Sequence, residues 1–346
     1  MKKDTNYKLS PLAPLNSVIH VKRYRKAVNE EKLAAELLKM KIAGDDDLEK
    51  LDYLNGVLTS KDSEFEVPNL VHFIWFNNHT YRVIDYVCML SALRNQKPDF
   101  LLVHGDVEPV GVLWQWLKDE AGEKLKFVKK TPPKSIFGRK LRKIEHMSDV
   151  ARLHILLQVG GVYLDTDTMV LQSLNELRKQ HEISLGVFSR EWMANAIIVA
   201  NKRSWFLRKW FFSYRDIISQ TGQVSSALDV HWSMRVPMVL AQMYPSKVHV
   251  ESTRLMRPNN EKTEVKHFFE GLLDLSDHLT VHLNARWMPE RFRGKTIPQL
   301  AVLNTTYGEV VRRALWNGSA TREPTPWILH PRFNSSLVVN VPRKRG

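Results

Sequence analysis

Two aspartates separated by one residue, Asp165 and Asp167, have the clearest potential for chemistry in this sequence. In an extended chain their side chains would point to the same side, because side chains alternate along a strand. Burying two carboxylates beside the apolar segment 162–164 is costly unless a positive group lies between them. Carboxylate oxygens suit hard cations such as Mn²⁺ or Mg²⁺, which in turn hold phosphate oxygens. The pair therefore predicts a metal–phosphate site; the alternative is a polar turn in which one aspartate caps the next element.

Asp149 and Arg152 form a second pair, whose i and i+3 spacing places both residues on one face of a helix. The guanidinium of Arg152 can neutralise a phosphate oxygen or donate to a sugar hydroxyl, and the carboxylate of Asp149 can accept hydrogen bonds from a sugar. The alternative is a structural salt bridge between the two residues.

A helix followed by a strand is predicted to carry all four of these side chains. Ser148 or Asp149 can cap the helix, whose apolar positions recur at helical spacing, and the glycine pair 160–161 ends it. Residues 162–164 then form a short buried strand, and Asp165 lies at its end.

Further strands and helices define the fold class. Helices are predicted at 81–95 and 114–118, and apolar strands at 70–76, 100–104, 125–128, 184–188, 196–200 and 279–284. The alternation of strands and helices over the first half indicates an α/β fold with a mostly parallel central sheet. Ligands of such sheets bind at the carboxyl ends of the strands, which is where the two aspartates lie.

The blocks Ser148-Asp149-x-x-Arg152 and Gly160-Gly161-Val-Tyr-Leu-Asp165-Thr-Asp167 resemble the signature of the DXD-containing sugar-transferase family. That family includes yeast mannosyltransferases, α-1,4-galactosyltransferases and α-1,4-N-acetylglucosaminyltransferases, and the clostridial glucosylating toxins carry a similar block. The segment Val-Pro-Asn-Leu-Val-His-Phe-Ile-Trp-Phe at 67–76 is similar to the opening strand of the family. Together the two matches cover the region from 67 to 174.

This resemblance implies a GT-A-type, Rossmann-like nucleotide-binding fold and a metal-dependent transfer of a sugar with retention of configuration. The donor would be a nucleotide-sugar, with a UDP-sugar favoured over GDP-mannose, and the acceptor a glycan, glycolipid or glycoprotein. Mn²⁺ or Mg²⁺ would be the cofactor.

The resemblance also implies further site residues. The end of the first strand, Ile74 and Trp75, would lie under the nucleotide base, and the alternative for Trp75 is a place in the core. His282 would complete the metal site; the competing roles are a phosphate contact or a core histidine.

Composition and charge limit the function classes. The chain is 43% apolar and 25% charged, as in an ordinary globular protein, and its net charge is +14. That charge attracts polyanions, so membrane-surface association is an alternative, whereas a nucleic-acid partner lacks a supporting motif.

The basic segment 129–143 could be a loop over the donor. An inactive nucleotide- or glycan-binding relative is the other alternative to an enzyme, and no P-loop supports a phosphotransferase.

Three segments are expected: a helical N-terminal extension (1–66), the catalytic domain (67–300), and a C-terminal segment that packs on it and ends in a basic tail (301–346). No signal peptide or membrane anchor is recognisable in the sequence. Four sequons favour the Golgi, whereas the single cysteine, Cys88, also fits the cytoplasm; the sequons begin at Asn78, Asn304, Asn317 and Asn334.

Overall fold

The computed structural model describes residue 54 and residues 64–77, 80–189, 192–221, 231–256 and 262–316. Most of the predicted N-terminal extension therefore lies outside the described residues, as do the basic tail, Asn78 of the first sequon, and the sequons that begin at Asn317 and Asn334. Within the described ranges, no helix has both the length and the apolar character that crossing a membrane requires.

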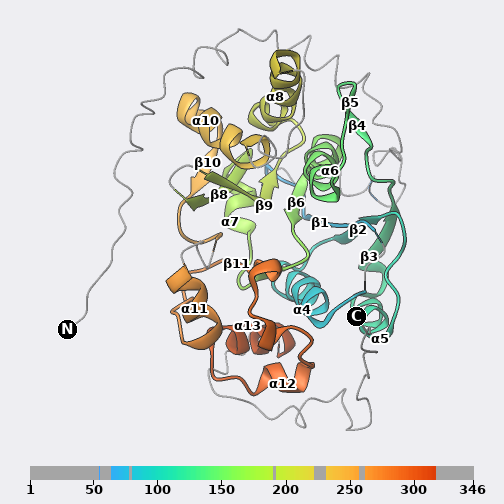
Figure 1. The fold of residues 1–346 in the computed structure, drawn as a ribbon, viewed down its shortest axis with the longest axis vertical. Helices are drawn as coiled ribbons and strands as arrows, with labels where there is room; N and C mark the ends of the chain where they lie inside the picture. Colours follow the sequence, from blue (N-terminus) through green and yellow to red (C-terminus); the bar gives the residue numbers. More distant parts are fainter. Residues whose placement is uncertain are drawn as a thin grey trace, which may run out of the picture.

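A seven-stranded sheet organises the molecule (Figure 1). In spatial order its strands are β10 (His249–Glu251), β8 (Ile183–Ser189), β9 (Trp192–Ala200), β6 (Gly161–Leu164), β1 (Leu70–Trp75), β2 (Phe100–Gly105) and β3 (Leu125–Lys129). Strand β9 is antiparallel to both of its neighbours, and the other adjacent pairs are parallel. The predicted α/β fold with a mostly parallel sheet is therefore confirmed.

Strand β1 is buried at every position because helices cover both faces of the sheet. Phe73 and Trp75 point into one core, and Leu70 and Ile74 point into the other, as the two-residue period of a strand requires. The first core is covered by α4 (Val83–Ser91), α5 (Val112–Ala121), α11 (Lys262–Glu270) and α13 (Thr306–Leu315). The second is covered by α6 (Ile144–Val159), α8 (Trp205–Thr221) and α10 (Val236–Met243).

Shorter elements connect these layers. Two small antiparallel ribbons pair β4 (Ser135–Ile136) with β5 (Arg139–Lys140), and β7 (Thr168–Val170) with β11 (Thr280–His282). The short helices are η2 (Ala92–Gln96), η3 (Gly122–Lys124), α7 (Asn175–Gln180), η4 (His231–Arg235), η5 (Pro245–Lys247), η6 (Ala285–Trp287), η7 (Glu290–Phe292) and α12 (Ile297–Ala301).

Helix α6 starts earlier than its sequence predicts. It begins at Ile144 with Lys143 at the N-cap, so the predicted cap at Ser148 or Asp149 is wrong. The carboxylate of Asp149 is instead engaged by Arg152 and by the side-chain amide of Asn195. The end of the helix is as predicted, because Gly160 adopts a left-handed φ of 70°.

The order of the strands creates a topological switch point next to the predicted site. Strands β1, β2 and β3 follow one another to one side, whereas β6 lies on the other side of β1. Ligands of open α/β sheets bind in the crevice where the strand order reverses. Asp165 directly follows β6, and the β7–β11 ribbon pairs His282 with Thr168, one residue after Asp167.

Candidate functional site

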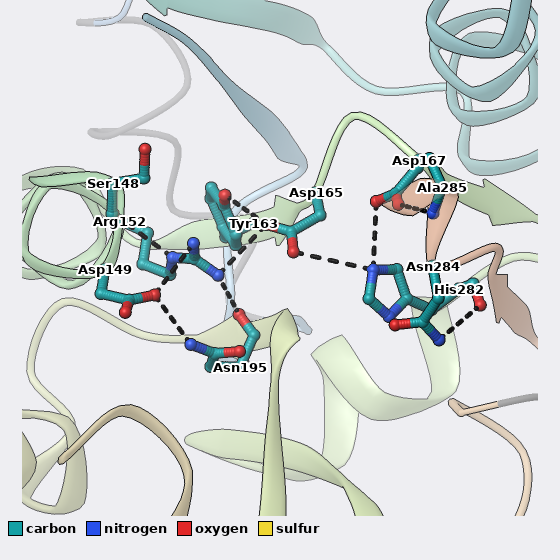
Figure 2. A network of polar contacts seen from close by, with 10 residues as sticks. All are labelled: Ser148, Asp149, Arg152, Tyr163, Asp165, Asp167, Asn195, His282, Asn284 and Ala285. Carbon is teal, nitrogen blue, oxygen red and sulfur yellow. Dashed lines mark hydrogen bonds and ion pairs between the residues drawn. The ribbon is translucent and has the colours of Figure 1, made fainter. Parts of the chain in front are cut away.

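Asp165, Asp167 and His282 converge at the switch point, although His282 is more than a hundred residues away in sequence (Figure 2). Nε2 of His282 lies 3.0 Å from Oδ1 of Asp167 and 3.8 Å from Oδ2 of Asp165. Each of the three residues offers one ligand atom, and these atoms all lie within 4.8 Å of one another. Two carboxylates and one imidazole are a donor set that suits a divalent cation such as Mn²⁺.

The two aspartates lie in a turn rather than in extended chain. The amide of Thr168 donates to the carbonyl of Asp165 at 2.9 Å, which closes a four-residue turn, and the amide of Asp165 donates to the carbonyl of Ala196 on β9 at 2.8 Å. The predicted extended geometry of the pair is therefore wrong. The turn nevertheless directs both carboxylates toward His282, so the predicted convergence is retained by a different backbone path.

Asp167 is held as an anion by its surroundings. Its burial alone would raise the pKa of the carboxyl, but the adjacent His282 and the amide of Ala285, which donates to Oδ2 at 2.7 Å, lower the pKa to about 2. The carboxylate is therefore charged over the whole physiological pH range and ready to act as a ligand.

Arg152 forms the second half of the site. Nη1 of the guanidinium lies 3.1 Å from Oδ1 of Asp165, Nη2 lies 3.1 Å from Oδ1 of Asp149, and Nη1 also donates to the carbonyl of Asn195 at 2.7 Å. Burial alone would lower the pKa of Arg152, but Asp165 and Asp149 raise it above its ordinary value. The salt bridge between Asp149 and Arg152 is present, and through Asp165 it is joined to the Asp–Asp–His cluster.

Tyr163 and Asn195 complete the site: Tyr163 had no predicted role, whereas the family resemblance puts Asn195 where the chain approaches the acceptor. The Tyr163 hydroxyl donates to Oδ1 of Asp165 at 2.6 Å, and its ring lies 4.5 Å under the guanidinium carbon of Arg152. Asn195 donates from Nδ2 to Asp149 at 2.8 Å. The two-residue period of a strand places Tyr163 on the same side as Asp165, so this contact had a signal in the sequence. The contact of Asn195 with Asp149 depends on how the strands pair, and the local sequence pattern does not predict that pairing.

Trp75 occupies the core, so its predicted role beneath a nucleotide base is not supported by the structure. Its side chain is 0% exposed and packs edge-on against Tyr81 at 5.4 Å between ring centroids. Ile74 is also buried, in the core on the opposite face of the sheet. The physical reason is the cover on both faces of β1, which leaves both side chains buried.

An α/β fold with a cluster of two carboxylates and an imidazole at its switch point defines a protein that is suited to bind a divalent cation and phosphate. Residues 84–184 match the family model described as the glycosyltransferase sugar-binding region containing the DXD motif. This part of the chain is therefore similar to the DXD-type glycosyltransferases, which is the family that the sequence resembles.

Known proteins are similar to the chain over different lengths. The glucan organizing enzyme 1 of Cryptococcus neoformans var. grubii is 28% identical over 220 residues, which are 58% of this chain and 57% of that protein. The chain thus matches little more than half of that relative. Among solved structures, the galactosyltransferase LgtC with donor and acceptor sugar analogs has a TM-score of 0.39 at 12% identity, covering 73% of this chain and 96% of LgtC. The PaToxG glycosyltransferase has a TM-score of 0.37 at 16% identity, covering 58% and 81%.

Proposed function

We propose that the protein is a metal-dependent glycosyltransferase that transfers a sugar from a nucleotide-sugar to a glycan, glycolipid or glycoprotein acceptor. The observation that carries this proposal is the convergence of Asp165, Asp167 and His282 beside the Asp149–Arg152 pair. The first group is suited to hold a cation, and the second to bind phosphate or sugar oxygens, so one site contains both functions that a nucleotide-sugar donor requires.

The donor set fits Mn²⁺ or Mg²⁺, because carboxylate oxygens and one imidazole nitrogen are ligands that these ions accept. Asp165, Asp167 and His282 would hold the ion; when bound, it would act as a Lewis acid toward the negative charge that develops on the departing diphosphate. The hydrogen bond from Ala285 and the contact with His282 fix the orientation of Asp167 before any ligand arrives.

Arg152 and its partners would orient the donor. The guanidinium is fixed by Asp149, Asp165 and the carbonyl of Asn195, so it can be aimed at a donor oxygen with little loss of side-chain freedom. The Tyr163 hydroxyl holds Asp165 in place at the same time. We propose a UDP-sugar ahead of GDP-mannose as the donor, and retention of configuration, from the resemblance of the sequence to the DXD family.

The experiment that tests the proposal is the release of free nucleotide from a panel of UDP- and GDP-sugars in the presence of Mn²⁺, with and without chelator. Wild type is compared with Asp167→Asn, which keeps the volume of the side chain and removes its charge. Asp119→Asn is the matched control, because Asp119 is an exposed aspartate on α5.

Turnover that requires Mn²⁺ and is lost in Asp167→Asn, but retained in Asp119→Asn, would support the proposal and identify the donor. If the protein binds a nucleotide-sugar only with Mn²⁺ but turns over none of the donors, with or without an added acceptor, the inactive relative is favoured. Turnover that is unaffected by chelator and by Asp167→Asn would contradict the assigned site.

A further inference from the structure

A small basic hairpin lies at the outer edge of the molecule, beside α6 and α8 (Figure 1). It pairs Ser135 with Lys140 and Ile136 with Arg139, and the turn between the strands is Phe137-Gly138. Both turn residues have a left-handed φ, 46° for Phe137 and 78° for Gly138, which is the signature of a tight type I′ turn. The basic segment that the sequence suggested as a loop over the donor thus has a defined shape.

Apolar side chains anchor this hairpin to the core. The ring of Phe137 packs on Phe211 and Phe212 of α8, at centroid distances of 5.7 and 5.8 Å. Ile136 and Leu141 are 2% and 5% exposed. A phenylalanine with positive φ is strained, and the strain is tolerated here because its ring is packed against α8. The hairpin is therefore held in one orientation on the body of the protein.

The exposed side chains of the anchored hairpin and of its neighbours in sequence are densely cationic. Between residues 124 and 143 the chain has nine lysines and arginines and no acidic residue. Five cationic side chains on and around the hairpin are exposed: Lys134, Arg139, Lys140, Arg142 and Lys143. Within the described part of the chain, none of these five side chains makes an ion pair or a hydrogen bond. Their charge is thus not neutralised by any of the described residues.

We propose that this basic hairpin, residues 134–143, is a docking surface for an anionic membrane. Clusters of four to eight lysines and arginines bind acidic lipid headgroups, because each cation near such a surface adds electrostatic attraction. The net charge of +14 on the whole chain would draw the protein to the same surface from a distance.

The environment of Phe137 favours a lipid surface over a nucleic acid. Binding of single strands combines cations with aromatic faces on which bases stack. Phe137 is the aromatic residue of the hairpin, and its ring is turned onto α8, so it offers no such face. The cations therefore act as exposed point charges without a stacking face beside them, which fits anionic headgroups better than bases.

The test is co-sedimentation of the full chain with vesicles of phosphatidylcholine alone, or of phosphatidylcholine with phosphatidylserine, at low and at high salt. The test variant carries Arg139→Gln, Lys140→Gln and Arg142→Gln. The matched control carries Lys97→Gln, Lys247→Gln and Lys266→Gln, which removes three exposed cations elsewhere and changes the net charge equally. Thermal unfolding and binding to single-stranded RNA are measured on the same proteins.

We expect wild type to bind the phosphatidylserine vesicles at low salt and to leave them at high salt. The hairpin variant should lose at least about tenfold in partition coefficient, and the control much less. Equal losses in the two variants would show that net charge alone matters and would overturn the proposal. So would the absence of wild-type binding to the anionic vesicles, or RNA binding that is lost in the hairpin variant while vesicle binding is unchanged.

Discussion

At the scale of single residues, Arg152 compensates two carboxylates that have little access to water. The exposed fractions of the side chains are 6% for Arg152, 14% for Asp149 and 26% for Asp165. Removal of the cation from such a group leaves buried negative charge without a compensating positive charge. We expect Arg152→Met to lower the free energy of unfolding by about 3 kcal/mol, as measured by urea denaturation.

The same variant separates a structural role from a site role for Arg152. Mn²⁺ should restore more stability to Arg152→Met than it adds to wild type, because a bound cation would take over the compensation of Asp165. Arg94→Met is the control, since Arg94 forms a similarly buried pair with Glu120, at 2.8 Å, outside the Asp–Asp–His cluster. An equal effect of Mn²⁺ on all three proteins would contradict the prediction.

Trp75 provides a second test at the residue scale. Because the side chain is fully buried, Trp75→Leu should cost about 3 kcal/mol of stability through lost packing. The KM for the nucleotide-sugar should remain within about twofold of wild type, whereas loss of base stacking would raise it by at least about fivefold. Steady-state kinetics at a temperature where the variant is folded distinguish the two outcomes.

At the scale of elements, the sequence predicts the apolar strands better than the backbone around the site. Strands β1, β2, β3, β8 and β9 lie within a few residues of their predicted positions, because continuous apolar runs are specified locally. The predicted start of α6 is wrong, because Asp149 is a partner of Arg152 and does not cap the helix. Side chains such as Asp149 have competing hydrogen-bond partners, and only the folded chain decides between them.

Gly161 shows how one element depends on a missing side chain. A Cβ at this position would lie 2.6 Å from both the Nε2 of His72 and the carbonyl oxygen of Leu70, and φ is 122°. Strand β6 would have to move away from β1, and Asp165 would move with it. Gly161→Ala should therefore lower stability by about 3 kcal/mol or more and abolish Mn²⁺-dependent activity.

Gly138→Ala isolates the contribution of backbone strain in that experiment. Gly138 also has a positive φ, 78°, but a Cβ there would meet nothing within 4 Å. We expect this variant to lose only about 1 kcal/mol, which is the cost of the left-handed conformation. Calorimetric unfolding of the two variants side by side gives the comparison, and equal losses would mean that the contact with His72 is not the cause.

At the scale of the whole molecule, the sequence predicts the layers but not every long-range contact. The resemblance placed His282 at the metal site, and the antiparallel pairing of β11 with β7 explains how it arrives there. The amide of Ala285 that fixes Asp167 carries no signal in the residue types, because any residue has a backbone amide. Hydrogen bonds from backbone amides to site residues depend on the fold of the backbone and not on the residue types.

The centre of the sheet contains a buried histidine pair that links the stability of the whole molecule to pH. Nε2 of His72 lies 2.8 Å from the carbonyl oxygen of Gly160, and Nδ1 lies 3.1 Å from Nε2 of His104. Burial lowers the pKa of His72 from 6.5 to about 4, although the hydrogen bond to Gly160 opposes part of the shift. His72 is completely buried and is therefore a core histidine.

Because the pKa of His72 is lower in the folded than in the unfolded chain, the unfolded chain binds the proton first as the pH falls. The stability that depends on neutral His72 is fully present above pH 6.5 and is lost as the pH falls toward 4, by about 3 kcal/mol. Urea denaturation at several pH values should show this loss in wild type and in His267→Gln, where the replaced histidine is exposed. His72→Gln should be less stable at neutral pH but lose less on acidification. An unchanged pH dependence in His72→Gln would mean that other groups control the acid sensitivity of the fold.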